Sequence, residues 1–138
     1  MPTALVRLRV PASAAGRERD VTNSRTIEDK KVSKTLEKVR ELVARGELRI
    51  SIHGYDELAA DDVPVRSIVA GLETAVVVED YPTFGKGPCV LVLQMDAAGQ
   101  PIHVVWGIPK GQDSPAVVIT AYRPDPAKWD ETWQRRRR

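Results

Sequence analysis

The residues of this chain with the clearest capacity for chemistry are two histidines and three polar residues near its end. His103, Thr120, Tyr122 and Arg123 lie in two apolar runs, and His53 comes much earlier. Histidine titrates near neutral pH without perturbation, so both histidines could move protons. Arg123 and Lys110 could hold a phosphate, the arginine through paired hydrogen bonds, and the two hydroxyls could donate to it, although Lys110 lies in a loop and could simply be solvated. Because RNA carries its own nucleophile, the 2′-hydroxyl, such groups could cleave it without a metal.

Each of these residues also has an ordinary structural interpretation. His53 lies four residues before Glu57, so the two side chains share a helix face and could form a surface pair or a catalytic pair. His103 could simply satisfy a neighbour inside the core, and Tyr122 could be a core aromatic with its hydroxyl at the surface. Arg123 could pair with Asp125 or with a carboxylate of a helix. Both interpretations stay open at this point.

Other kinds of catalytic centre have little support in the sequence. The two histidines with Glu57 or Asp56 could in principle hold a metal, but the chain has no HExxH motif, no paired CxxC motif and no closely spaced histidines. Residues 85–87 lack the rest of a phosphate-binding loop and indicate a turn. The single cysteine, Cys89, lies in an apolar run and is expected to be a small buried residue. We therefore expect no cofactor and no metal.

Composition indicates one globular domain. A chain of 138 residues with 42% hydrophobic and 29% charged residues can form a compact core, and its net charge of +2 gives no general case for nucleic-acid binding. Residues 1–31 have no sustained period and are expected to form a poorly ordered arm, although residues 4–10 could add a short strand. Residues 32–134 would form the domain, and residues 135–138 a basic tail that could bind RNA or DNA.

The first residues do not resemble a signal peptide, because Arg7 and Arg9 interrupt the apolar run that such a peptide needs. No run reaches the length of a transmembrane helix. A cytoplasmic protein without membrane contact is therefore expected.

Periodicity predicts helices first and strands afterwards. Helices are expected over residues 33–45, 51–60 and 64–72, and strands over 76–81, 90–95, 101–106 and 116–123. A short helix is expected around Trp129 and Trp133. This order predicts an α+β domain in which the helices pack on one face of a mainly antiparallel sheet of about four strands.

Strand alternation then predicts which side chains share a face. His103, Thr120 and Tyr122 would lie together on the face turned away from the helices, where a site could form. The residues turned towards the helices would be Ile102, Val104 and Trp106 on one strand and Val117, Ile119 and Ala121 on the other.

Several blocks in the same order carry a family resemblance. They are Ser51-Ile-His-Gly-Tyr-Asp-Glu-Leu58, Pro101-Ile-His-Val-Val105 and Val118-Ile-Thr-Ala-Tyr-Arg-Pro-Asp-Pro-Ala-Lys-Trp129. Over residues 36–129 the chain resembles the bacterial "domain of unknown function 4258" family, which is similar to the RelE/ParE-type toxins. The resemblance implies a RelE/ParE-like fold, and many such toxins cleave RNA. In many relatives arginines follow the helix histidine, at the positions of Glu57 and Asp61 here, so this helix is unusually acidic.

Three functions remain open at this stage. The chain could be a ribonuclease toxin of a toxin–antitoxin system, in which His53, Glu57, His103, Thr120, Tyr122 and Arg123 are the candidate catalytic residues. It could instead be an inert module that binds a small antitoxin or another protein. A third possibility is an accessory domain that binds RNA or DNA through its terminal arginines.

Overall fold

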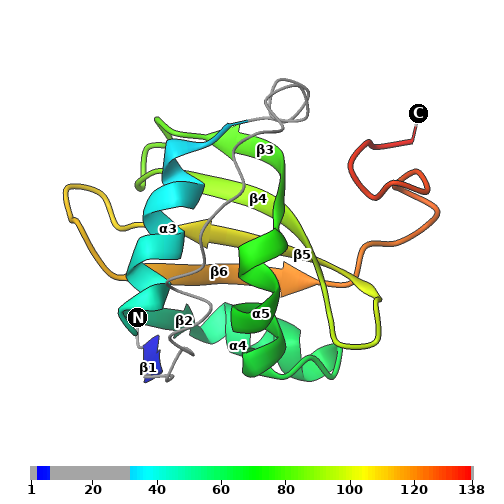
Figure 1. Ribbon diagram of the computed structural model, residues 1–138, viewed down its shortest axis with the longest axis horizontal. Coiled ribbons are helices and arrows are strands. Elements are labelled where there is room, and N and C mark those ends of the chain that lie inside the picture. The colour runs from blue at the N-terminus through cyan, green and yellow to red at the C-terminus, as the bar shows by residue number, and fades with distance from the viewer. Residues whose placement is uncertain (1–2, 7–31, 138) are drawn as a thin grey trace, which may run out of the picture.

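The chain folds as an α+β domain in which helices precede most of a mixed sheet (Figure 1). The computed structural model describes residues 3–6 and 32–137, and side chains only in the second range. The elements are β1 (Thr3–Val6), α3 (Lys34–Ala44), β2 (Leu48–Ser51), α4 (Ile52–Ala60), α5 (Val65–Gly71), a 3-10 turn (Leu72–Thr74), β3 (Val76–Tyr81), β4 (Cys89–Met95), β5 (Pro101–Gly107) and β6 (Ala116–Tyr122). Most of the expected N-terminal arm lies outside the described residues.

The sheet has six strands in the order β1-β2-β6-β5-β4-β3. Strands β3 to β6 form the expected antiparallel meander, whereas β2 runs parallel to β6 and pairs with β1. The prediction of about four strands was therefore too low. The strand β2 was missed because it has only four residues and follows directly on a helix end. There the N–H groups of Gly46 and Glu47 bond to the carbonyls of Val43 and Leu42, which turns the chain sharply into β2.

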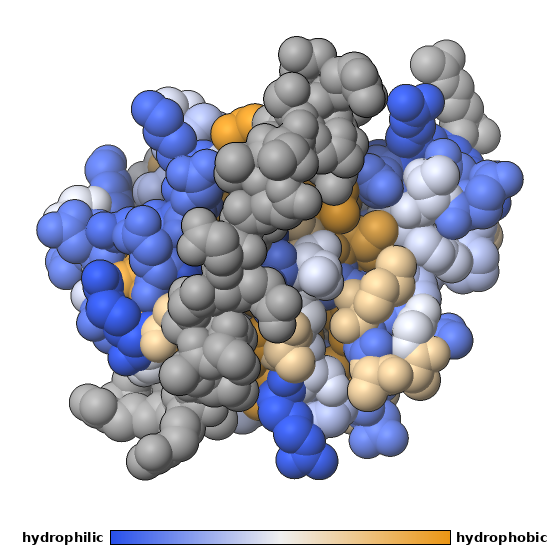
Figure 2. All heavy atoms as spheres, in the orientation of Figure 1, coloured by the Kyte–Doolittle hydropathy of each residue, from blue (hydrophilic) through white to orange (hydrophobic). Residues whose placement is uncertain are grey.

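Helices α3 and α5 pack on one face of the sheet, here called the helix face. Ser33 caps α3, since its hydroxyl accepts a hydrogen bond from the Leu36 N–H at 3.0 Å. The side chains buried between α3, α5 and the sheet include Leu36, Val39, Leu42, Val43, Ile68 and Leu72. Figure 2 shows the outer surface of α3 as largely hydrophilic, as an amphipathic helix requires.

Helix α4 occupies a different place from the one expected. It lies beside β6 at the point where β2 ends, so it covers an edge of the sheet rather than its face (Figure 1). Ser51 makes the change of direction, because its hydroxyl accepts from the Gly54 N–H and donates to the Ile119 carbonyl, both at 2.9 Å. Gly54 allows the close approach, since a Cβ there would lie 2.9 Å from the Val118 carbonyl oxygen.

A β-bulge in β6 changes the expected facing of that strand. The inward residues of β5, Ile102, Val104 and Trp106, are buried as predicted. On β6 the register shifts next to Val105 and Trp106 of β5. The inward residues are therefore Ala116, Val118 and Ala121, and Ile119 is exposed. Because the bulge adds one residue, Thr120 and Tyr122 still face away from the helices, as predicted. Simple alternation from Ala116 and Val118 would have turned them towards the helices.

The chain after β6, residues 124–137, is here called the C-terminal segment. It contains turns instead of the helix expected around Trp129 and Trp133. Asp125 and Asp130 each accept a backbone hydrogen bond from the residue two positions ahead, which favours turns over a continuing helix. Trp129 and Arg136 then pair as an isolated bridge. Arg136 and Arg137 of the predicted basic tail both make hydrogen bonds to other parts of the protein.

Candidate functional site on the second face of the sheet

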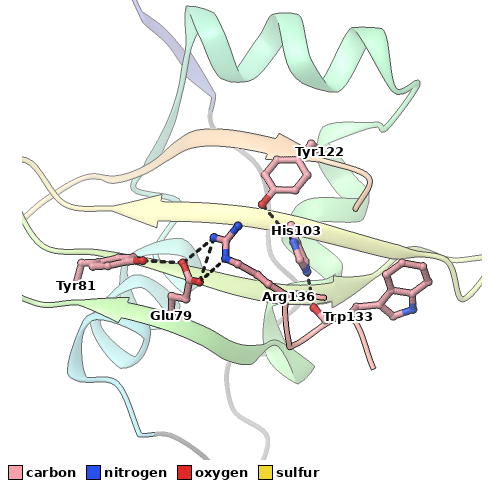
Figure 3. Close-up of polar contacts among 6 residues, drawn as sticks. All are labelled: Glu79, Tyr81, His103, Tyr122, Trp133 and Arg136. Carbon is pink, nitrogen blue, oxygen red and sulfur yellow. Dashed lines mark hydrogen bonds and ion pairs between the residues drawn. The ribbon is translucent and has the colours of Figure 1, made fainter. Parts of the chain in front are cut away.

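The face of the sheet opposite the helices, here called the second face, carries two short chains of polar contacts (Figure 3). In one chain Tyr122 contacts His103, which contacts the backbone of Trp133. The other chain runs from Tyr81 to Glu79 to Arg136 and is described below. These residues come from β3, β5, β6 and the C-terminal segment.

His103 is fully buried and both of its ring nitrogens have partners. Its Nε2 lies 2.7 Å from the Trp133 carbonyl oxygen, and its Nδ1 lies 3.3 Å from the Tyr122 hydroxyl. A carbonyl can only accept a hydrogen bond, so Nε2 carries the proton and Nδ1 accepts from Tyr122. Burial lowers the pKa of His103 and keeps the ring neutral, although the hydrogen bond to the Trp133 carbonyl opposes that effect.

Aromatic rings enclose the same histidine. The ring of Trp129 meets it edge-on at 4.5 Å between centroids, and the ring of Tyr122 does so at 5.3 Å. Burial raises the pKa of Tyr122, so its hydroxyl stays protonated at neutral pH. The prediction that His103 and Tyr122 lie together is confirmed, and Thr120 is on the same face. In the described conformation, however, the C-terminal segment covers His103.

The second polar chain is more exposed than the first. The Arg136 guanidinium contacts both oxygens of the Glu79 carboxylate, through Nε at 3.2 Å and through Nη2 at 3.1 and 3.3 Å. The Tyr81 hydroxyl donates to the same carboxylate at 2.6 Å, and this bond is the main reason that the pKa of Tyr81 is raised. The side chains of Arg136 and Glu79 are 63% and 28% exposed, so solvent reaches this pair.

The two polar chains influence each other electrostatically. The charge of Arg136 lowers the pKa of both His103 and Tyr122, and the charge of Glu79 raises both. Figure 3 draws the Arg136 guanidinium between Glu79 and the His103–Tyr122 pair. Thr120 lies farther from the second polar chain, because β4 and β5 separate it from Glu79. Three strand spacings of about 4.8 Å place their backbones roughly 14 Å apart.

His53 and Glu57 pair with each other on the surface of α4. The His53 Nε2 lies 3.7 Å from the Glu57 carboxylate, and the His53 side chain is 67% exposed. The buried residues of α4 are Gly54 and Leu58, so the helix presents its histidine to solvent. The ordinary surface pair left open by the sequence is thus present. The expectation that His53 approaches His103 gains no contact from the structure.

The polar groups of Arg123 are engaged in contacts within the protein and do not form an open phosphate site. Its guanidinium contacts the Asp96 carboxylate at 2.8 Å and the Pro101 carbonyl at 3.2 Å. Its backbone N–H donates to the Asp61 carboxylate at 2.8 Å, which ties the end of α4 to the end of β6. The pKa of Asp96 is lowered, chiefly by the Gln100 backbone N–H and also by Arg123. A carboxylate partner is therefore present, but it is Asp96, between β4 and β5, rather than the predicted Asp125 or a helix carboxylate.

Sequence reasoning missed Glu79, Tyr81 and Arg136. Alternation along residues 76–81 could have suggested that Glu79 and Tyr81 share a face, as they do. Arg136 gave no such signal, because a terminal arginine run is typical of a solvated tail. Only the path of the C-terminal segment brings it back over the sheet.

Other residues considered from the sequence have ordinary positions. Cys89 is buried as predicted, and burial raises the pKa of its thiol. Lys110 is exposed in the loop before β6. Within residues 32–137 no group of three histidine, cysteine, aspartate or glutamate side chains is placed to hold a metal ion. None of the described helices has the length and apolar character needed to cross a membrane.

Comparison with known proteins identifies the family. The model of the family described as "Domain of unknown function (DUF4258)" matches residues 50–123, which is more than half of the chain. No curated protein and no solved structure was found to match. The matched range begins in β2 and ends just after β6, so it contains α4, both histidines and the meander that carries the second face. The chain therefore belongs to the DUF4258 family.

Proposed function

We propose that this domain is a toxin-like ribonuclease that cleaves RNA without a metal at the exposed part of its second face. The observation that carries the proposal is the Tyr81–Glu79–Arg136 chain, in which a hydroxyl, a carboxylate and a guanidinium lie within hydrogen-bond distance and remain partly exposed. These groups match the donor, base and cation that metal-independent cleavage requires. We propose in addition that the fold is similar to that of the RelE/ParE-type toxins, many of which cleave RNA.

The proposed reaction is an internal transfer at one phosphodiester. Glu79 takes the proton of the 2′-hydroxyl, and the 2′-oxygen attacks the phosphorus while the bond from phosphorus to the 5′-oxygen breaks. Arg136 turns towards the phosphate and balances its developing charge. Tyr81 gives its proton to the departing 5′-oxygen and regains one from Glu79. The products are a 2′,3′-cyclic phosphate and a free 5′-hydroxyl.

The substrate would have to compete with Glu79 for Arg136. The Glu79 carboxylate uses Nε and Nη2 of the guanidinium, and Nη1 could contact a phosphate before that pair separates. The pair is at the surface, where an ion pair contributes about 0–1 kcal/mol, so its separation costs little. Because His103 is buried, it would not take the proton of the 2′-hydroxyl itself. Its neutral ring would only contribute to the shape of the site.

A second function is favoured by a different observation. The surface of α4 carries Asp56 and Glu57, and Asp62 follows the end of the helix; these carboxylates would repel RNA, and His103 is covered. These features suit an inert module that binds a small protein partner such as an antitoxin. An acidic helix would be complementary to a basic segment of that partner.

The test uses purified protein and single-stranded RNA in the presence of EDTA. The ribonuclease proposal expects cleavage products that end in a cyclic phosphate, and it expects Glu79→Gln to lower the rate by about a hundred-fold or more. Intact RNA with and without added divalent metal, together with tight binding of a small protein partner, would instead support the inert module.

A further inference from the structure

We propose that the C-terminal segment is a displaceable cover, which must open locally before any ligand can reach the buried His103. Such a cover would control access to the second face whether or not that face cleaves RNA. Three features of the segment support the proposal: the separate small core beneath it, the hydrogen bonds within it and the few polar contacts that hold it to the sheet.

The surface beneath the segment is a separate small core. Trp129 packs with Val78, Leu91 and Leu93, and partly buried Val105 and Trp133 lie against this group. The main core lies on the helix face and contains no residue beyond Ala121. Opening of the C-terminal segment would therefore disrupt the small core and leave the main core in place, as local unfolding requires.

The segment holds its shape mainly through contacts within itself. The Lys128 and Trp129 N–H groups donate to the Asp125 carbonyl, and the Arg137 N–H donates to the Lys128 carbonyl at 2.8 Å. The Asp130 carboxylate accepts from the Thr132 backbone and hydroxyl at 3.0 and 2.6 Å. Such local bonds can survive while the segment swings away from the sheet as a unit.

Few polar contacts tie the segment to the sheet. One is the hydrogen bond from His103 to the Trp133 carbonyl, and another is the exposed ion pair between Arg136 and Glu79. Trp133 has a φ of 63°, in the left-handed region that a bulky residue avoids. That conformation belongs to the turn in which the Trp133 N–H donates to the Asp130 carbonyl at 2.9 Å, so the segment would keep it while moving as a unit.

The contact with His103 also indicates what the cover replaces. The Trp133 carbonyl supplies an oxygen acceptor to the Nε2 proton of a neutral histidine. When the cover opens, that proton and the rings beneath it become available to an oxygen acceptor from outside. The segment therefore occupies the position that a ligand oxygen would take.

The test exploits the fact that the chain has only two histidines. Diethyl pyrocarbonate modifies accessible neutral imidazoles, and peptide mass spectrometry separates the modification of His103 from that of His53. His53 is exposed and serves as the internal control. In the unaltered protein His103 should react far more slowly than His53, at a rate set by opening of the cover.

Two variants should open the cover to different extents. Trp129→Ala removes its main apolar anchor and should speed modification of His103 by at least about tenfold. Asp130→Ala loosens the turn without touching the sheet and should speed it by roughly three- to tenfold. Phe84→Ala is the control, since Phe84 is an exposed apolar residue in the loop before β4, outside the segment.

Global unfolding is monitored separately through Trp106, whose buried indole N–H donates to Gln94 at 2.9 Å. Faster modification of His103 with unchanged exchange of the Trp106 indole proton supports a local cover. An unchanged His103 rate in both variants would overturn the proposal. Acceleration of His103 only in proportion to Trp106 exchange would overturn it as well, because the segment would then be a fixed part of one cooperative core.

Discussion

Replacing Gly54 with alanine tests the docking of α4, the helix that carries His53, against β6. Alanine in a helix normally stabilises by about 1 kcal/mol relative to glycine. At Gly54, however, the new Cβ would lie 2.9 Å from the Val118 carbonyl oxygen and 3.2 Å from the Ile50 Cγ2. The carbonyl belongs to the backbone of β6 and cannot rotate away, so α4 must shift.

The expected magnitude follows from these two opposing effects. Forcing a methyl group into a filled contact costs about 1–3 kcal/mol. After the helix-propensity gain is subtracted, Gly54→Ala should lower the free energy of unfolding by about 1 kcal/mol. For a domain of this size that corresponds to a fall in Tm of roughly 3–5 °C.

Urea and thermal unfolding measure the effect, with Gly85→Ala as the matched control. A Cβ at Gly85 would meet nothing within 4 Å and its φ is not in the left-handed region, so that variant should be unchanged or slightly more stable. If Gly54→Ala raised the stability by about 1 kcal/mol, as in an exposed helix, then α4 would not be docked as described.

Three further predictions concern the histidines and Arg123. Burial lowers the pKa of His103 below its unfolded value of about 6.5, so the unfolded chain binds the proton more tightly than the folded protein does. The stability that His103 contributes is therefore fully present above about pH 6.5 and is lost as the pH falls below it. The slope of the unfolding free energy approaches about 1.4 kcal/mol per pH unit. Urea unfolding between pH 5 and 8 should show this slope in the unaltered protein and in His53→Gln but not in His103→Gln. His53→Gln should change the free energy of unfolding by less than about 0.5 kcal/mol and leave RNA cleavage intact, because His53 is an exposed residue of α4; a large loss of cleavage would return it to the site. Arg123→Ala should lower the Tm while the folded protein keeps its cleavage rate, since Arg123 joins Asp96 and the Pro101 carbonyl; an unchanged Tm with lost cleavage would restore its phosphate role.

Much of the helix face could be predicted from the sequence. The apolar residues of α3 recur at helical spacing, and the alternation of Ile102, Val104 and Trp106 correctly gave the inward side of β5. These patterns are local and strong, because burial of one face imposes a period on the side chains.

The errors in the sheet and in the candidate site come from contacts between distant parts of the chain, whereas the helix wrongly expected around Trp129 is replaced by local turns. The strand β2 is defined by parallel pairing with β6, some 68 residues later, and the bulge in β6 is defined by its register with β5. Neither leaves a clear local period. The same holds for the candidate site, since Arg136 meets Glu79 across 57 residues.

If cleavage depends on the Arg136–Glu79–Tyr81 chain, two neighbouring arginines should differ in their importance for the reaction. Arg136→Lys keeps the charge but loses the planar fork that contacts Glu79 and would hold a phosphate. Arg137→Lys makes the same change at a residue whose guanidinium donates to the Pro126 carbonyl. With RNA and EDTA, Arg136→Lys should lower the single-turnover cleavage rate by about a hundred-fold, and Arg137→Lys should leave it within about twofold. Equal rates for the two variants, or cleavage that survives in Arg136→Lys, would show that the Arg136–Glu79–Tyr81 chain does not catalyse cleavage.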